Sequence, residues 1–238
     1  MRHIPNILTS INLLLGCTAL IFVFEGRMHI AAIIIGIAAI FDFADGLAAR
    51  VLKAYSAIGK DLDSLADLVS FGIVPASVVF IYMLDSKNFP EISSVIWLAA
   101  MPAFLITLFS AIRLAIFNND SRQKESFIGL PTPANAIFFL SLPVVLEYSQ
   151  SGTPIHYAVE LITTDYYNML ILTVLSSALL VSNIPLFSLK FKDFKIKNNL
   201  TRYIFLFISL ILLVILFVQA IPLIIIFYLI LSLINNLF

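Results

Sequence analysis

The chain of 238 residues lacks the charged surface that a soluble domain needs. Only 12% of its residues are charged, against about a quarter in a typical soluble domain, and 61% are hydrophobic. The formal net charge is zero, so no basic field points to nucleic acid as a partner. Apolar runs of about 17–25 residues, the length that crosses a bilayer as a helix, recur from end to end. This composition predicts a polytopic membrane protein.

Cysteine and histidine are also scarce. The one cysteine, Cys17, excludes an intrachain disulfide, and the three scattered histidines form no metal-binding pattern. The stretch LLLGC that ends at Cys17 resembles a lipoprotein cleavage site. However, Asn6, Thr9 and Asn12 interrupt the apolar run before it, and more apolar runs follow. We therefore expect a retained first helix.

The fold class predicted from these runs is all-α, a membrane bundle of about eight transmembrane helices. The run from Thr201 to Asn236 is too long for a single crossing, and Gln219 and Pro222 mark a turn within it. The predicted helices cover residues 5–24, 28–50, 59–84, 93–118, 131–149, 164–187, 201–218 and 221–236.

The basic residues predict the orientation. With the N-terminus in the cytoplasm, eight crossings leave only Arg27 and Lys87 outside. The basic residues then inside are Arg2, Arg50, Lys53, Lys60, Arg113, Arg122, Lys124, Lys190, Lys192, Lys195, Lys197 and Arg202. Because basic residues favour the cytoplasmic side, we expect an integral protein of the cell (inner) membrane with this orientation. The stretch 149–165 has no basic residue and is expected to be an outer loop.

Acidic residues concentrate in the stretch DFADGLAARVLKAYSAIGKDLDSLAD. Asp42 and Asp45 are three residues apart, and Asp63 and Asp67 are four apart, so each pair lies on one face of a helix. A connection of about eight residues makes the two helices antiparallel neighbours. The two pairs, named here the acidic cluster, are therefore expected to face each other at the cytoplasmic boundary of the membrane.

Two interpretations of the acidic cluster compete, a solvated face and a metal site. Apolar residues surround the acids, so part of the cluster should be buried. Two ionised carboxylates about 4 Å apart repel by about 4 kcal/mol at an effective dielectric constant near 20. Hard divalent cations such as Mg²⁺ or Mn²⁺ remove that cost, so we favour a metal site. Metals on carboxylates at a membrane surface suggest chemistry on a diphosphate.

The same stretch has a longer pattern, D-x-x-D-G-x-x-A-R, then eight residues, then G-x-x-x-D-x-x-x-D. It resembles the signature of the CDP-alcohol phosphotransferases, and every fixed position and both gaps agree. The segments PNILTSINLLLG, DSLADLVSFGIVPA, RLAIFN and GLPTP are similar to the integral-membrane phosphatidylserine synthases within that family. The resemblance extends to about Lys197 and implies a helical membrane enzyme.

The resemblance implies a specific reaction and a division of the chain. Residues 1–200 would form the catalytic membrane domain, with a core of six helices, and residues 201–238 an added pair of helices. The donor would be CDP-diacylglycerol, the acceptor L-serine, and the products phosphatidylserine and CMP, formed by direct displacement. Two divalent ions, Mg²⁺ or Mn²⁺, are implied as cofactors. Members of the family are often dimers, so a homodimer is compatible with the resemblance.

Site residues follow from the resemblance by position. It implies that Asp67 is also the general base for the serine hydroxyl. The implied metal ligands are Asp42, Asp45, Asp63 and Asp67. The residues implied to contact the CDP moiety are Asp45, Gly46, Ala49, Arg50 and Gly59.

The acceptor residues are predicted from chemistry. Arg113 lies among apolar residues, a costly position without a partner, and is our candidate for the serine carboxylate or a phosphate. Snorkelling to the membrane surface, or pairing with an aspartate of the cluster, are the alternatives. Asn118, Thr132 and Asn135 are candidates to donate or accept hydrogen bonds. Asn6, Thr9 and Asn12 recur every three residues and either face the donor or make packing hydrogen bonds between helices.

Three other functions compete with the interpretation that the chain transfers a phosphatidyl group to serine. A sister enzyme of the family would use glycerol 3-phosphate or inositol phosphate, anionic acceptors that need an additional basic cluster. An intramembrane prenyltransferase normally has its two acidic motifs in separate halves of the chain, whereas here both lie in one short stretch. A cation transporter would have its acids near the bilayer centre in broken helices, whereas these lie at helix ends.

Overall fold

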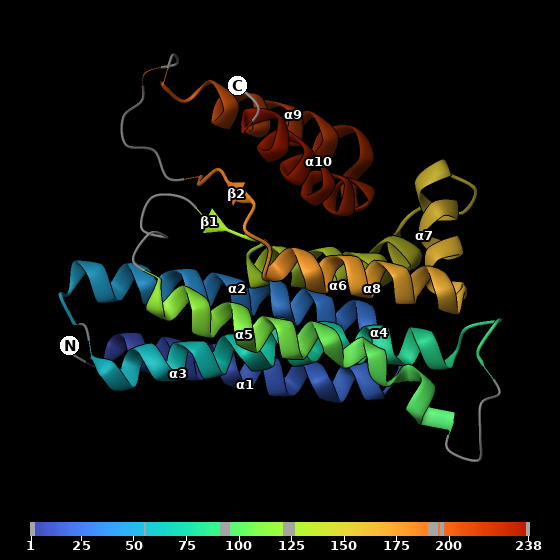
Figure 1. Ribbon diagram of the computed structural model, residues 1–238, viewed down its shortest axis with the longest axis horizontal. Coiled ribbons are helices and arrows are strands. Elements are labelled where there is room, and N and C mark those ends of the chain that lie inside the picture. The colour runs from blue at the N-terminus through green and yellow to red at the C-terminus, as the bar shows by residue number, and fades with distance from the viewer. Residues whose placement is uncertain are drawn as a thin grey trace.

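The computed structural model shows a bundle of helices that run mostly along its longest axis (Figure 1). It describes residues 3–54, 56–90, 96–120, 127–189, 195 and 198–236. The α-helices are α1 Ile4–Phe24, α2 Met28–Val51, α3 Ala57–Asp67, α4 Val74–Leu84, α5 Leu105–Asn119, α6 Thr132–Tyr148, α7 Pro154–Thr164, α8 Tyr166–Leu180, α9 Leu200–Leu216 and α10 Ala220–Asn235. The remaining elements are the π-helix η1 Leu68–Ile73, the 3-10 helices η2 Ile96–Phe104 and η5 Phe217–Gln219, and the strands β1 Phe127–Ile128 and β2 Pro185–Leu186.

The prediction of a polytopic helical membrane protein is confirmed. Among the described residues, five segments are long and apolar enough to cross a membrane, the fifth being the whole run Leu200–Asn235, and α6 and α8 are shorter apolar helices. Their outward faces are apolar, as lipid-facing surfaces are. On α1, for example, Ile7, Leu14 and Ile21 are all exposed and follow one another at intervals of seven residues, on one side of the helix.

Small buried residues bring the first two helices close together. Ala19 of α1 and Ala31 and Ala38 of α2 have no exposed surface, and all three belong to one apolar cluster with Phe71 of η1. Small side chains allow the backbones of membrane helices to approach closely. A second apolar cluster joins α4, η2, α5, α6, α7 and α8.

The helix predicted for residues 59–84 contains a change of helical type. It begins at Ala57, where Ser56 Oγ accepts a hydrogen bond from the Gly59 amide at 3.0 Å. After Asp67 the chain continues through the π-helix η1 before α4 resumes regular α geometry. π-helical turns inside α-helices are rare and are found frequently at functional sites.

Two of the predicted helix boundaries are wrong. The helix predicted for 164–187 ends at Leu180, and Pro185 lies in strand β2. Proline has no amide hydrogen and disfavours helical geometry in the residue before it, so the apolar run does not continue as helix. The helix predicted for 93–118 is a 3-10 helix, which contains Pro102, followed by α5, and residues 93–95 lie outside the described residues.

The stretch 149–165, predicted as an outer loop, contains helix α7. Thr153 caps this helix by accepting a hydrogen bond from the His156 amide at 3.3 Å, and Pro154 occupies its first position. Asp165 then caps α8 by accepting a hydrogen bond from the Asn168 amide at 2.9 Å, which holds the pKa of the Asp165 carboxyl below its usual value. The absence of basic residues in this stretch carried no information about its secondary structure.

Helices α9 and α10 form an antiparallel pair, named here the C-terminal hairpin. Thr201 Oγ1 donates a hydrogen bond to Asn235 Oδ1 at 2.7 Å, so the start of α9 lies beside the end of α10. The chain reverses at Phe217, which has a positive φ of 49°. The predicted pair 201–218 and 221–236 is therefore confirmed. The hairpin covers one side of the bundle and packs on α6 and on β2 (Figure 1).

The predicted orientation stays a prediction. Six of the basic residues that support it lie outside the described residues: Arg2, Arg122, Lys124, Lys190, Lys192 and Lys197. Residues from the acidic cluster, from the end of α5 and from the start of α6 line one cavity, so these three parts of the chain lie close together.

Candidate active site

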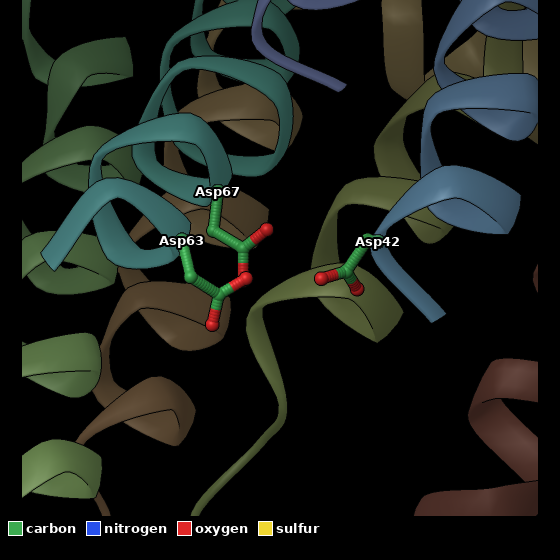
Figure 2. A group of neighbouring side chains, drawn as sticks. All are labelled: Asp42, Asp63 and Asp67. Carbon is green, nitrogen blue, oxygen red and sulfur yellow. The ribbon is translucent and has the colours of Figure 1, made fainter. Parts of the chain in front are cut away.

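Helices α2 and α3 bring three of the four predicted acids together. Carboxylate oxygens of Asp42, Asp63 and Asp67 lie within 4.8 Å of one another. Figure 2 shows Asp63 and Asp67 side by side on α3, with Asp42 opposite them on α2. Asp67 is buried, and Asp42 and Asp63 are half-buried. The cluster is therefore not a solvated face.

Asp45 is held apart from these three carboxylates. It is buried on α2, and its Oδ2 accepts a hydrogen bond from Thr9 Oγ1 at 2.5 Å. The single Thr9 hydroxyl hydrogen is shared with a second acceptor, the Pro5 carbonyl, at 3.0 Å. The four-acid cluster predicted from spacing is thus a group of three with Asp45 at its margin, directed by a side chain of α1.

A second residue of α1 fixes Asp67. Asn12 Nδ2 donates a hydrogen bond to Asp67 Oδ1 at 3.2 Å, and Asn12 Oδ1 accepts one from Ser70 Oγ at 2.8 Å. Ser70 lies in η1, opposite Gly16 of α1, where an added Cβ would be 2.5 Å from Ser70 Oγ. The close approach at Gly16 therefore allows the π-helical turn to orient the Asn12 amide against Asp67.

A cavity of about 470 Å³ opens on one side of Asp63 and is named here the Arg50 cavity. Every residue predicted for the CDP moiety lines it: Asp45, Gly46, Ala49, Arg50 and Gly59. Asn6 and Thr9 of α1 also line this cavity. These two residues therefore face the predicted donor pocket, which was the first of the two alternatives given for them. Arg50 Nε donates to the Gly46 carbonyl one turn earlier at 2.9 Å, which holds the guanidinium along the helix.

A cavity of about 250 Å³ opens on the other side of Asp63 and is named here the Arg113 cavity. It contains Asp42 and Asp67 as well as the predicted acceptor residues Arg113, Asn118 and Thr132. Asn118 Nδ2 donates to Ser64 Oγ at 2.6 Å, and Lys60 Nζ donates to the Asn118 carbonyl at 2.6 Å. These two hydrogen bonds fasten the end of α5 to α3.

Arg113 is buried with unsatisfied donors. Its side chain is 3% exposed, so it does not snorkel to the surface. Its guanidinium carbon lies 5.5 Å from the centre of the Phe117 ring, and no described residue accepts a hydrogen bond from its Nε or Nη1. Buried charged donors without an acceptor are costly, so these two nitrogens suit the residue to an anionic ligand in the cavity it lines.

Asn135 shares this lack of partners. It is 1% exposed, and within the described part of the chain neither its Oδ1 nor its Nδ2 has a hydrogen-bond partner. It lies one turn after Thr132 on α6, although it is not among the residues that line the Arg113 cavity. The structure therefore brings Arg113, Asn118 and Thr132 to one cavity, whereas Asn135 is buried and is not part of its lining.

Several lining residues were not predicted. Phe117 lines both cavities, Lys60 lines the Arg50 cavity, and Pro131 and Pro133 line the Arg113 cavity. Lys60 had an available signal, because it adjoins Gly59 of the motif. Phe117 had none, since an aromatic residue in an apolar helix is unremarkable in sequence.

The acidic cluster can hold a divalent cation. Three carboxylates converge, and no described residue donates a hydrogen bond to the buried Oδ1 of Asp63. At about 4.8 Å and an effective dielectric constant near 20, each ionised pair would repel by about 3–4 kcal/mol without a compensating charge. Hard oxygen ligands suit Mg²⁺ or Mn²⁺, and the identity of the ion stays open.

Residues 2–181 match the family model of the CDP-alcohol phosphatidyltransferases. The chain is 35% identical over 149 residues to a Mycobacterium leprae protein named CDP-diacylglycerol–serine O-phosphatidyltransferase, covering 60% of this chain and 47% of that protein. A Helicobacter pylori protein of the same name is 30% identical over 237 residues, covering 98% of this chain and 91% of its own. For a Bacillus subtilis protein of that name the identity is 32% over 157 residues, covering 64% and 84%. The chain spans about half the length of the mycobacterial relatives that it matches.

Proposed function

Because the chain belongs to the CDP-alcohol phosphatidyltransferase family, we propose that it transfers the phosphatidyl group of CDP-diacylglycerol to the hydroxyl of L-serine. The products are phosphatidylserine and CMP. The names of the relatives that match this chain support the proposal. The observation that carries it is the pair of cavities that meet at Asp63, one with the CDP motif residues and one with a buried arginine.

The Arg50 cavity takes the CDP-linked donor in this proposal. Gly46 supports this assignment, because a Cβ at this position would have no neighbouring atom within 4 Å, so the helix leaves open space there. Arg50 supplies a positive charge for a phosphate at the mouth of the cavity. The lipid chains of the donor then extend into the bilayer beside the exposed apolar faces of the helices.

Serine occupies the Arg113 cavity, with its carboxylate on the Arg113 guanidinium. The unpartnered Nε and Nη1 leave two charged donors of Arg113 available to an anionic group such as a carboxylate. Arg113 is the one basic residue among the described lining residues. Glycerol 3-phosphate or inositol phosphate would bring a phosphate that one arginine neutralises poorly. The charge of the cavity therefore favours a zwitterionic acceptor over the acceptors of the sister enzymes.

Asp42, Asp45, Asp63 and Asp67 would hold two divalent cations, Mg²⁺ or Mn²⁺. When bound, such ions neutralise the diphosphate of a CDP-linked donor and improve CMP as a leaving group. The chain's own residues hold the two substrates on either side of Asp63. Ideal alignment of two reactants can lower an activation barrier by about 7–11 kcal/mol, and positioning here supplies several kcal/mol of that.

The transfer is a single displacement in which Asp67 is the general base. A serine hydroxyl is a weak nucleophile and needs such a base. Asp67 takes the hydroxyl proton while the serine oxygen forms a bond to the phosphorus that carries the lipid. The bond from that phosphorus to CMP breaks, and its electron pair leaves on the CMP oxygen. Asn12, which donates to Asp67 Oδ1, keeps the carboxylate directed toward the acceptor side.

The test is an acceptor panel with the full-length purified protein in lipid nanodiscs. CDP-diacylglycerol and Mn²⁺ or Mg²⁺ are supplied with labelled serine, glycerol 3-phosphate or inositol phosphate, and both CMP and labelled lipid are measured. We expect CMP release that requires serine and equals phosphatidylserine formed. Turnover with another acceptor and none with serine would leave the family assignment intact and refute the acceptor. CMP release without any acceptor would contradict the direct displacement.

A further inference from the structure

The C-terminal hairpin holds the main chain of one short segment by three hydrogen bonds. Tyr228 Oη donates to the Phe187 carbonyl at 2.9 Å, Asn236 Nδ2 to the Pro185 carbonyl at 2.6 Å, and Arg202 Nε to the Ser188 carbonyl at 2.6 Å. Tyr228 is the most deeply placed donor, with 7% of its surface exposed. Its ring also packs edge-on against the ring of Phe187, with centres 5.0 Å apart. The hairpin thus contacts β2 and the residues that follow it through specific groups, in addition to apolar packing.

Strand β2 connects these hydrogen bonds to the segment that leads into α6. It pairs with β1 in antiparallel register, Phe127 opposite Leu186 and Ile128 opposite Pro185. The Gly129 amide then donates to the Ile184 carbonyl at 2.8 Å, and the Leu130 amide donates to the Leu179 carbonyl at 2.9 Å.

Gly129 fits a position that no other residue would occupy without strain. Its φ is +79°, and an added Cβ would lie 2.6 Å from the Leu180 carbonyl oxygen and 2.9 Å from that of Ser182. Both contacts are with main-chain atoms, which have little freedom to move. The end of α8 and the start of α6 are therefore locked together at this glycine.

The locked segment continues directly into the wall of the Arg113 cavity. Leu130 is buried against Leu186 and Tyr228 in one apolar cluster. The next two residues, Pro131 and Thr132, line the Arg113 cavity. No residue of α6 or of the segment before it is among the described lining of the Arg50 cavity. A shift of this segment would change the Arg113 cavity and leave the Arg50 cavity unchanged.

We propose that Tyr228 is a positioning residue for the acceptor: through the Phe187 carbonyl and the β2–β1 pairing, it holds Pro131 and Thr132 at the wall of the Arg113 cavity. This inference rests on the proposed function, in which that cavity takes serine. It gives the C-terminal hairpin, which contributes no residue to either cavity among the described residues, a role in acceptor affinity.

The experiment compares Tyr228→Phe with Tyr166→Phe in the full-length protein. Tyr166 is a matched control because it is 5% exposed and its hydroxyl donates to a main-chain carbonyl, that of Ala99, at 2.8 Å, at the start of α8 and away from β1 and β2 in the chain. For Tyr228→Phe we expect the KM for serine to rise about two- to tenfold, the range of one lost hydrogen bond, with the KM for CDP-diacylglycerol unchanged. Tyr166→Phe should leave both KM values unchanged.

Amide hydrogen exchange supplies a readout that does not depend on the reaction. In Tyr228→Phe the Gly129 and Leu130 amides should exchange faster than in the wild type, and in Tyr166→Phe they should not. Faster exchange in Tyr228→Phe alone supports the link even if the acceptor panel shows that the acceptor is not serine. In that case the proposed function is wrong, and the KM for the acceptor that does react is measured in place of the KM for serine.

Three outcomes would overturn the inference. They are an unchanged serine KM in Tyr228→Phe, an equal rise in both KM values, and a rise in serine KM with Tyr166→Phe as well. If Tyr228→Phe does not fold, Asn236→Ala replaces it. Its matched control is Asn235→Ala, which removes the neighbouring amide that joins α9 to α10 without touching β2. The serine KM should then rise with Asn236→Ala alone.

Discussion

The Arg50 cavity and the Arg113 cavity share Asp63 and Phe117 but are assembled in different ways. The lining of the Arg50 cavity comes from α1, from one stretch of α2 and α3, and from Phe117 alone beyond them. The Arg113 cavity combines α2 and α3 with α5 and α6, which are far apart in the chain. A local motif therefore specifies the first cavity almost completely, whereas the second depends on how distant helices pack.

The largest expected effect tests whether the two cavities have separate tasks. Asp67 lines the Arg113 cavity and is not among the lining of the Arg50 cavity. Asp67→Asn keeps the size of the side chain but removes the base, so we expect turnover to fall by about 10²–10⁴. Binding of CDP-diacylglycerol, measured by titration in nanodiscs, should stay largely intact. An equal loss of donor binding would show that Asp67 acts chiefly as a metal ligand.

The next effect concerns the buried arginine. In Arg113→Ala the KM for serine should rise about ten- to a hundredfold, because hydrogen bonds to charged groups are the strong ones. Arg113→Lys keeps the charge but not the planar fork, and should recover only part of this loss. Steady-state kinetics with each substrate varied in turn separates the two KM values. A rise confined to the donor KM would assign Arg113 to the other substrate.

The smallest effect comes from adding one methyl group to the Arg50 cavity. Gly46→Ala and Gly36→Ala both place a Cβ on α2 where no atom lies within 4 Å. Each should stabilise the protein by about 0.5–1 kcal/mol, since glycine is unfavourable within a helix. Only Gly46→Ala fills space in the cavity, so it alone should raise the KM for CDP-diacylglycerol, by about fivefold. Equal donor kinetics in the two variants would exclude the Arg50 cavity as the donor site.

The difference between the cavities also explains what the sequence predicted well. The spacings of Asp42, Asp63 and Asp67 indicated neighbouring helix faces, and the structure brings the three carboxylates together. The separate position of Asp45 was not predictable, because it depends on the Thr9 hydroxyl of another helix. Periodicity places residues on a face of their own helix and says nothing of which partner that face meets.

The errors in the fold have a similar origin. The run after α8 is apolar and was predicted to continue as helix, yet Pro185 and Leu186 form a strand with residues about 60 positions earlier. A two-residue strand has no periodicity to detect. Helix α7 was missed because the stretch was judged by its lack of basic residues, although Thr153 and Pro154 are a helix start signal.

The π-helical turn after Asp67 has a consequence for how this helix tolerates change. A π-turn contains one more residue than an α-turn, so it shifts the sequence pattern by one residue, roughly 100° of α-helix, without rotating the two helical halves against each other. The aspartates of α3 and the buried apolar residues of α4 therefore keep the relative orientation that they would have in a continuous α-helix with one residue fewer. Deleting one residue between Leu68 and Ile73 would therefore restore a continuous α-helical ladder and leave both aspartates facing α2, whereas a deletion within α3 or α4 would rotate one half of the helix by roughly 100°.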